Sequence, residues 1–380
     1  MTVLRSAIDV RLAVATLLAA LALSAALVGA VRAYALRARV IDTPNERSSH
    51  TVPTPRGGGL GAVGAFLTVA AVAGGLRSAL TAPLLAALLA IAGVAAVGWM
   101  DDHRPLPVLP RLVTHGAAGL VVAWLAAASH PVAATAAAVA WFVWWVFWSV
   151  SVINIVNFMD GIDGLIGSQV ALFAASVALR AAPSSFSMLF ALSLAGAAAG
   201  FLLWNWAPAR IFLGDVGSGA LGLAVVVAGL LLIVQGRGGV VLAYLPLLPL
   251  FLDASVTIAR RAWRGERLTA PHRSHLYQRL ANGGWGHARV SAAYLAAASV
   301  GVAVVLGPEQ WRLPLAATYA LAVLAVGAWL DRAVKLRTSG LPSVVDPAGH
   351  PTRAAGVRSD LPAAREVASN SVRRNGATRP

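Results

Sequence analysis

The sequence predicts an all-α polytopic membrane protein, a helical bundle with about eleven transmembrane helices. The chain has 380 residues, of which 58% are hydrophobic and only 12% are charged, and its mean hydropathy is +0.73. Soluble domains carry about 25% charged residues, so this composition excludes a water-soluble fold. The apolar stretches show no strand-like alternation. Because lipid cannot satisfy a bare backbone, we expect these stretches to be helices.

Eleven apolar stretches are candidate membrane helices. In chain order they are Leu12–Val31, Leu60–Leu76, Leu80–Met100, Leu112–Ala128, Val132–Val156, Leu165–Leu179, Phe186–Trp206, Val216–Val234, Gly239–Ala259, Val290–Leu306 and Leu313–Leu330. The first has no charged residue and no small-residue cleavage site, so we expect a retained span and not a signal peptide. After about residue 338 the composition turns to Pro, Gly, Ser and Arg. This change predicts a membrane domain over 1–337 and a disordered cytoplasmic tail over 338–380.

The basic residues predict how the bundle is oriented. The net charge is +15, and 24 of the 30 basic residues fall in the tail and in loops on the side that follows the first span. By the positive-inside rule this side is cytoplasmic, which places the N-terminus outside and the C-terminus inside. Since topology explains the positive charge, we do not expect nucleic-acid binding. The chain has no cysteine, which excludes thiolate chemistry.

The aspartate pair in GWMDDHRPL, residues 98–106, lies on the predicted cytoplasmic side. Asp101 and Asp102 repel each other, and they oppose the dipole at the end of a helix, which favours cations. Such a pair indicates a compensating cation or a basic group of a substrate. Pairing with Arg104 is the structural alternative.

A second acidic stretch, NFMDGIDGLIG, occupies residues 157–167 directly after an apolar run. On a helix, Asn154, Asn157 and Asp160 share one face at a spacing of three, and Asp163 follows. An isolated carboxylate in hydrocarbon costs about 2.5 kcal/mol or more. Helix capping would explain one such residue but not four, so we expect a polar site here.

Two further loops on the same side suit phosphate and metal binding. In IFLGDVGSGALG, residues 211–222, Asp215 comes just before a helix, where it can hold Mg²⁺ through oxygen or act as an N-cap. In residues 42–61, Arg47, His50 and Arg56 are donors suited to phosphate. The alternative for the second loop is an ordinary positive-inside connection.

The longest connection on this side contains TAPHRSHLYQRL, residues 269–280. His272, Arg273 and His275 favour phosphate binding, and the alternative is a surface loop attracted to anionic headgroups. Asp253 lies within the ninth apolar stretch. An acid there is a candidate functional residue, and pairing with a neighbouring helix is an equal alternative.

Taken together, these loops resemble the polyprenyl-phosphate N-acetylhexosamine-1-phosphate transferases, glycosyltransferase family 4. The matching elements, in the family's order, are RSSHTVPTPRGGG, the aspartate pair in GWMDDH, NIVNFMDGIDGL, FLGDVGS and PHRSHLYQ. They cover nearly all of residues 40–290 and look most like the branch that initiates O-antigen synthesis, and less like the muramoyl-pentapeptide branch.

The resemblance implies roles for these positions. Asp215 would be the principal ligand of Mg²⁺, with Mn²⁺ as the alternative ion, and Asn157 would lie beside the metal or the pyrophosphate. Asp101 and Asp102 would activate or position the lipid phosphate, which makes them catalytic together with Asp215. The implied substrate-binding residues are Asn154, Asn157, Asp160, Asp163, His272, Arg273, His275, Arg47, His50 and Arg56.

The resemblance also implies a reaction. An N-acetylhexosamine-1-phosphate, carrying GlcNAc or a 6-deoxy amino sugar, would pass from a UDP-sugar to undecaprenyl phosphate at the cytoplasmic face of the bacterial inner membrane, with release of UMP. The partners would be these substrates, membrane lipids and a second copy in a homodimer. Direct attack and a covalent phosphosugar-enzyme both remain open. The rival hypothesis is a transporter or flippase, which would place polar residues along the bundle and on both sides.

Overall fold

The computed structural model describes residues 2–44, 49–50, 52–129, 136–268, 270, 272–339, 344–345 and 351–352. The helices are α1 (Thr2–Ala38), α2 (Gly59–Leu76), α3 (Ala82–His103), α4 (Val108–Ser129), α5 (Ala136–Met159), α6 (Leu165–Arg180), α7 (Phe186–Asn205), α8 (Asp215–Val234), α9 (Val240–Tyr244), η1 (Leu245–Leu247), α10 (Leu248–Trp263), α11 (Leu276–Leu280), η2 (Ala281–Trp285), α12 (Gly286–Leu306) and α13 (Glu309–Ser339). The strands are β1 (Ile41–Asp42), β2 (Thr54–Pro55), β3 (Val344–Val345) and β4 (Pro351–Thr352).

The structure confirms the all-α polytopic prediction. Within the described ranges, ten helices are long and apolar enough to cross a membrane, and α6 is a shorter apolar helix of 16 residues. The predicted stretch Gly239–Ala259 is broken into α9, η1 and α10. Pro246 and Pro249 account for the break, because proline has no N–H to continue a helical ladder. The orientation of the termini stays a prediction.

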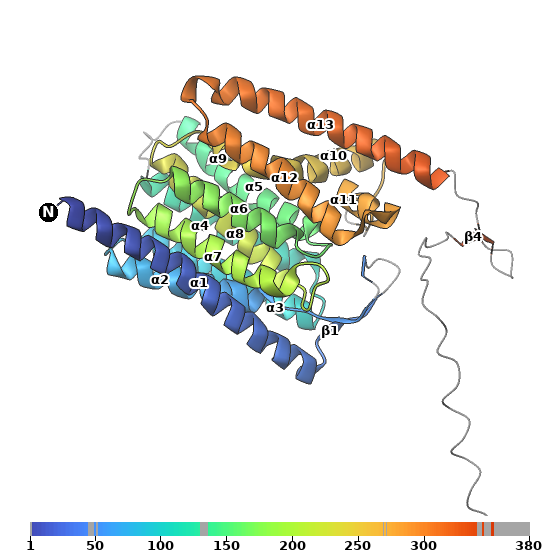
Figure 1. Cartoon of the computed structure of the whole chain (residues 1–380), viewed down its shortest axis with the longest axis horizontal. Helices are drawn as coiled ribbons and strands as arrows, with labels where there is room; N and C mark the ends of the chain where they lie inside the picture. The colour runs from blue at the N-terminus through green and yellow to red at the C-terminus, as the bar shows by residue number, and fades with distance from the viewer. Residues whose placement is uncertain are drawn as a thin grey trace, which may run out of the picture. The chain divides into compact units, whose positions relative to one another are not determined.

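Helix α8 lies at the centre of the bundle, with α1 and α2 on one flank and α12 and α13 on the other (Figure 1). Every residue from Val216 to Leu232 is buried, as a helix that is hydrophobic all round requires. Helices α2, α3, α5 and α6 pack against it. This packing fixes where α8 begins, and therefore where Asp215 lies.

At one end of the bundle, which we call the acidic end, α3 and α5 finish and α2 and α8 begin (Figure 1). The loop before α8 pairs with the loop before α2: the N–H of Phe212 donates to Pro55 O, and the N–H of Gly59 donates to Leu213 O, both at 2.8 Å. A Cβ on Gly59 would lie 2.2 Å from the Cα of Gly217, so only glycine fits here. This close approach brings Arg56 beside Asp215.

The chain forms two compact units, Met1–Arg337 and Thr338–Pro380. The first is the helical bundle. In the second, β3 and β4 form an antiparallel pair, with Val344 opposite Thr352. Most residues of the predicted tail lie outside the described ranges, so its disorder stays a prediction.

Candidate active site

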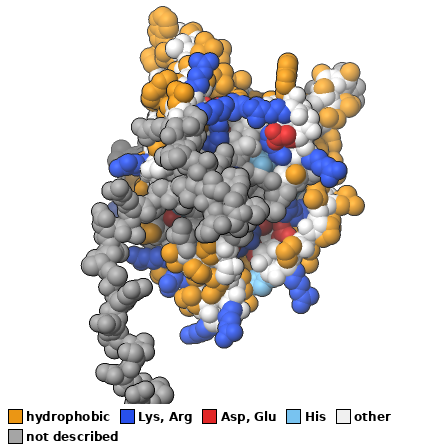
Figure 2. Space-filling view, turned by 90° about the vertical axis from the view of Figure 1, so that its right-hand side faces the viewer, with side chains coloured by type: hydrophobic (Ala, Val, Ile, Leu, Met, Phe, Trp, Pro, Cys, Tyr) orange, Lys and Arg blue, Asp and Glu red, His pale blue; other side chains and the backbone are white. Residues whose placement is uncertain are grey.

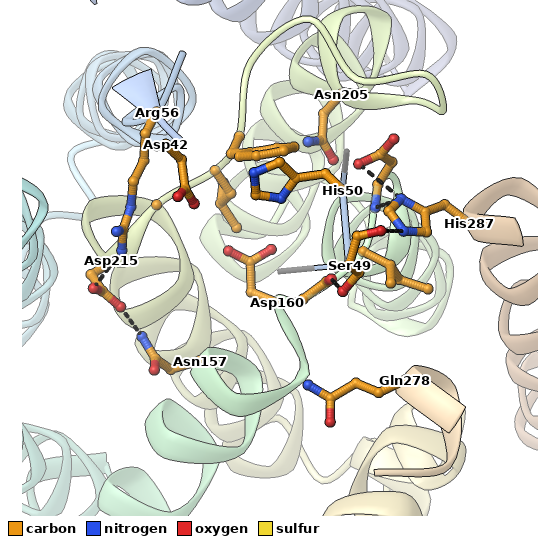
Figure 3. Close-up of a pocket in the computed structure, with 16 residues that line it drawn as sticks. Asp42, Ser49, His50, Arg56, Asn157, Asp160, Asn205, Asp215, Gln278 and His287 are labelled. Carbon is orange, nitrogen blue, oxygen red and sulfur yellow. Dashed lines mark hydrogen bonds and ion pairs between the residues drawn. The ribbon is translucent and has the colours of Figure 1, made fainter. Parts of the chain in front are cut away.

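A cavity of about 320 Å³ opens at the acidic end. Its walls come from the loop before α2, the connection between α5 and α6, the start of α8, and helices α11 and α12 (Figure 3). The cavity brings together six of the residues singled out in the sequence, namely His50, Arg56, Asn157, Asp160, Asp163 and Asp215. Segments more than 150 residues apart in the chain therefore build one polar site.

Asp215, the first residue of α8, faces this cavity. Its Oδ1 accepts a hydrogen bond from Asn157 Nδ2 at 2.6 Å, and its Oδ2 lies 2.8 Å from Arg56 Nη2. The same Asn157 nitrogen also donates to Ser218 Oγ at 2.9 Å. About a fifth of the Asp215 side chain stays exposed. The carboxylate is thus held in place and still accessible from the cavity.

Asp102 lies behind Asp215 and has no exposed side-chain surface. Its two oxygens accept the N–H groups of Asp215 and Val216, at 2.9 and 3.1 Å, and Oδ1 also pairs with Arg56 Nε at 2.7 Å. The start of a helix favours an anion in this place. Gly214 allows the approach, since a Cβ there would lie 2.5 Å from Asp102 Oδ2. Asp102 therefore does not line the cavity itself. It holds the start of α8 and Arg56 in position.

Asp101 is not among the residues that line the cavity, and its ion pair is with α4. Its carboxylate accepts the N–H of Leu106 and pairs with the guanidinium of Arg111. The partner is thus Arg111 and not Arg104, which was the structural alternative in the sequence. The structure does not bring Asp101 to the cavity, and its catalytic role stays a prediction.

Asn154 also lies outside the lining of the cavity, and its implied substrate-binding role stays a prediction. Its Nδ2 donates to Val150 O at 2.7 Å and lies 3.5 Å from His115 Nδ1. Helix α5 ends at Met159, so Asp160 no longer follows the helical spacing and turns into the cavity.

Asp160 projects into the cavity between Asp215 and His50 (Figure 3). Burial and the negative charge of Asp215 raise the pKa of Asp160 to about 8. The carboxyl is therefore largely neutral at pH 7 in the protein alone. A bound cation would favour its ionised form.

The opposite wall is built around Asp163. Its Oδ1 lies 3.2 Å from His287 Nδ1, and its Oδ2 accepts the N–H of Ala209 at 3.0 Å. The other ring nitrogen of His287 lies 3.1 Å from Ser49 O, and Ser49 Oγ donates to Gly161 O at 2.7 Å. This chain of contacts ties α12 to the loop before α2.

Sequence reasoning missed several lining residues. They include Asp42, Ser49, Asn205, Gln278 and His287. Gln278 and Ser49 stand within quoted motifs, so those motifs were a usable signal, whereas His287 was a lone histidine with no motif around it. His50 Nε2 is buried and meets no hydrogen-bond partner among the described residues, which suits a ligand in the cavity.

His272, Arg273 and His275 are not among the residues that line the cavity. His275 is buried, with Nδ1 3.8 Å from Asp253 Oδ1, and His272 Nδ1 lies 2.8 Å from Ser274 Oγ. Burial and the charges of His275 and Arg261 lower the pKa of His272 to about 4. The roles implied for His272, Arg273 and His275 stay predictions, and Arg47 lies outside the described residues.

Asp253 pairs with neighbouring elements, which was one of its two alternatives. Its Oδ1 accepts the N–H of Leu276 at 2.7 Å, and its Oδ2 accepts the N–H of Tyr277 at 3.1 Å and the hydroxyl of Tyr294 at 2.6 Å. These contacts cap the start of α11, the helix that presents Gln278 to the cavity. Asp253 is therefore a positioning residue of the site.

The donor set of the cavity fits a magnesium ion that arrives with a phosphate ligand. No group of three or more His, Asp or Glu side chains converges as a metal site in the part of the chain that the structure describes. Mg²⁺ usually takes one or two carboxylates, keeps several waters and is completed by substrate phosphates. Asp215 and the amide of Asn157 offer such a partial set, while an all-protein metal cage is not present among the described residues.

Fold and site together define a class: a polytopic membrane bundle with an acidic, phosphate-suited cavity at one end. Residues 84–233 match the model of glycosyl transferase family 4. A decaprenyl-phosphate N-acetylglucosaminephosphotransferase of Mycobacterium tuberculosis is 30% identical over 298 residues, covering 69% of this chain and 74% of that relative. The chain therefore belongs to glycosyl transferase family 4.

Two shorter matches carry different names. A phospho-N-acetylmuramoyl-pentapeptide-transferase of Salinispora arenicola is 34% identical over 119 residues, 31% of each chain. A probable undecaprenyl-phosphate N-acetylglucosaminyl 1-phosphate transferase of Bacillus subtilis is 32% identical over 117 residues, 30% of this chain and 32% of the relative. The chain thus matches about a third of the length of these relatives, and the assignment to the O-antigen branch stays a prediction.

Proposed function

We propose that this protein transfers an N-acetylhexosamine-1-phosphate from a UDP-sugar to undecaprenyl phosphate and releases UMP. Its family and the names of its relatives support a polyprenyl-phosphate acceptor. The observation that carries the proposal is the accessible Asp215 carboxylate, held between Arg56 and Asn157. The sugar would be GlcNAc or a 6-deoxy amino sugar, in the first membrane step of cell-surface polysaccharide or O-antigen synthesis. The cavity would face the cytoplasm at the bacterial inner membrane.

The proposed reaction does not require the protein to remove a proton from the nucleophile. A phosphate monoester has a second pKa near 6, so the lipid phosphate is mostly dianionic at pH 7. One of its oxygens attacks the β-phosphorus of the UDP-sugar. The bond from that phosphorus to the oxygen bridging the α-phosphate breaks, and UMP leaves with the bonding electrons. No proton has to leave the nucleophile, so no general base is required.

The main obstacle is repulsion between two anionic substrates, and the cavity wall carries groups that reduce it. Arg56 lies at this wall with about a third of its side chain exposed, fixed by Asp102 and Asp215. His50 Nε2, which has no hydrogen-bond partner among the described residues, offers a further contact for a phosphate or a sugar. Since both oxygens of Asp102 and of Asp215 are engaged in hydrogen bonds, we propose direct attack and not a covalent phosphosugar-aspartate.

Asp215 and Asn157 would hold Mg²⁺, with Mn²⁺ as the alternative. A cation bound there would neutralise pyrophosphate charge and stabilise the UMP leaving group. Asn157 keeps the Asp215 carboxylate turned toward the cavity, and Asp102 keeps the start of α8 in place.

The test uses purified full-length protein, undecaprenyl phosphate, Mg²⁺ and a panel of UDP-N-acetylhexosamines, with UMP and lipid-linked sugar as readouts. We expect one donor to give both products only with Mg²⁺, and Asp215→Asn to give neither. If folded protein released no UMP from any donor, a transporter of a lipid-linked or anionic sugar would become the better account.

A further inference from the structure

A second cavity, of about 580 Å³, lies between α10, α12 and α13. Most of its wall is apolar, with Leu252 and Val256 from α10, Val300 from α12 and Val323 from α13. Protein interiors are normally close-packed, and apolar walls offer water too few hydrogen-bond partners. In a membrane bundle, a space of this kind suits a hydrocarbon chain.

Polar contacts attach α13 to the bundle beside this cavity. The hydroxyl of Tyr319 donates to Ala297 O at 2.8 Å. Farther along α13, Asp331 is almost fully buried and pairs with Arg260 Nη1 at 3.3 Å and with the guanidinium of Arg279. These attachments hold α13 in place, so the cavity is framed by fixed helices.

Basic side chains gather at the Asp331 end of the cavity. Arg260 and Arg279 line the cavity and face the carboxylate of Asp331, and Lys335 Nζ lies 3.2 Å from the same carboxylate, outside the lining. Arg264 and Arg332 add to the positive field at Lys335. Lys and Arg side chains gather around this face of the molecule (Figure 2). Basic pockets between membrane helices are suited to anionic headgroups.

We propose that this cavity binds one anionic membrane phospholipid, with an acyl chain between α10, α12 and α13 and the phosphate at Arg260, Arg279 and Lys335. The apolar wall and the basic side chains at one end match the two parts of such a lipid. This site goes beyond the proposed transferase reaction, since it takes neither of the two substrates.

The proposed lipid is distinct from the polyprenyl acceptor because α11 separates the two cavities. Leu276, Arg279 and Leu280 line the phospholipid cavity, while Gln278 of the same helix lines the acidic cavity. Asp215 lines only the acidic cavity, so a phosphate held at Arg279 is not at the reaction site. A bound phospholipid would support α11 from the side opposite to the substrates.

Native mass spectrometry of the delipidated full-length protein tests the proposal without any turnover. The probes are phosphatidylglycerol, phosphatidylcholine and undecaprenyl phosphate. Two variants target the site. Gly327→Leu fills the cavity, since the Cβ position meets only Leu276 Cδ2 at 3.7 Å. The double variant Arg260→Gln, Lys335→Gln removes two cations and leaves Arg279 paired with Asp331. The matched controls are Ala325→Leu and Arg289→Gln, at exposed positions outside the cavity lining.

We expect one tightly retained phosphatidylglycerol per chain, bound at least tenfold more tightly than phosphatidylcholine. Each site variant should weaken this binding at least tenfold, and neither control should. Equal retention of the two phospholipids, or unchanged binding in Gly327→Leu, would overturn the proposal. If Gly327→Leu weakened the binding of undecaprenyl phosphate instead, the cavity would be a site for the acceptor, and the proposal would be overturned. Because the readout is binding, these results do not depend on whether UMP is ever released.

Discussion

In two regions of the bundle, a buried aspartate caps the start of a helix. In one, the buried Asp102 accepts the first N–H groups of α8, and in the other the buried Asp253 accepts the first N–H groups of α11. The first capped helix presents Asp215 to the acidic cavity, and the second presents Gln278. In both regions the buried acid positions a helix, and a different side chain meets the cavity.

The two regions differ in how the charge of the buried acid is compensated. Asp102 is paired with Arg56, a full charge that also contacts Asp215. Asp253 relies on the hydroxyls of Tyr294 and Thr257 and on the more distant ring of His275. Breaking a buried ion pair costs more than removing a neutral hydrogen bond. The α8 region should therefore be the more sensitive of the two.

The largest effect is expected at the side chain that meets the cavity. Asp215→Asn keeps an oxygen for Arg56 but loses the charge that would hold Mg²⁺, so UMP release should fall by about 10²–10³-fold. The measurement is UMP release at saturating substrates, with thermal unfolding as the control for folding. Activity within threefold of the wild type would remove Asp215 from the centre of the site.

Asp102→Asn should reduce stability more than any other change in this comparison. It leaves Arg56 without one buried partner, and we expect the free energy of unfolding to drop by about 3 kcal/mol. Chemical denaturation in detergent provides the measurement. The matched control is Asp9→Asn, which breaks a more exposed pair with Arg77 and should cost under about 1 kcal/mol. Equal losses in the two variants would contradict the positioning role of Asp102.

Asp253→Asn should have a smaller effect on stability, about 1–3 kcal/mol, because neutral donors surround the carboxylate. Since the cap of α11 weakens, Gln278 should shift, and KM for the UDP-sugar should rise more than kcat falls. The matched control Thr257→Val removes only the longest contact, 3.3 Å, and should leave KM unchanged. A fall in kcat with an unchanged KM would show that Asp253 acts in some other way.

A separate effect, which needs no substitution, is a pH dependence from Asp160. Its pKa in the folded protein is about 8, well above the ordinary value near 4. Ionising it is therefore unfavourable in the folded state, so the stability of the metal-free protein should fall as pH rises from 6 to 8 and then level off. Thermal unfolding across pH 6–9 checks this, and Asp160→Asn should lack the step. A stability that rose over the same range would contradict this placement of Asp160.

Composition and local motifs predicted most of the fold and about half of the candidate site. Long apolar stretches must be helices in lipid, and Asn157, Asp160 and Asp215 stand in motifs that imply a polar end. The expected shared face holds for Asn154 and Asn157 but not for Asp160, because α5 ends at Met159. Helix termini depend on local competition for hydrogen bonds, which a periodic pattern does not show.

The remaining site residues depend on contacts between distant segments. His287 is placed by Asp163 and Ser49, which are 124 and 238 residues away in the chain. Asp101 finds Arg111 across the turn between α3 and α4. No local sequence pattern indicates such pairings. A single sequence therefore could not distinguish Asp160, which lines the cavity, from Asp101, which does not.

The most direct test of the account follows the β-phosphorus of the donor. UDP-N-acetylhexosamine labelled at the β-phosphate is incubated with wild-type protein, undecaprenyl phosphate and Mg²⁺, beside Asp215→Asn. The expected result is label in a lipid-linked diphosphate sugar with unlabelled UMP, in the wild type alone. Label released as UDP would indicate transfer of the sugar without its phosphate. Label that stayed in intact UDP-sugar with the folded wild-type protein would contradict a sugar-1-phosphate transferase altogether.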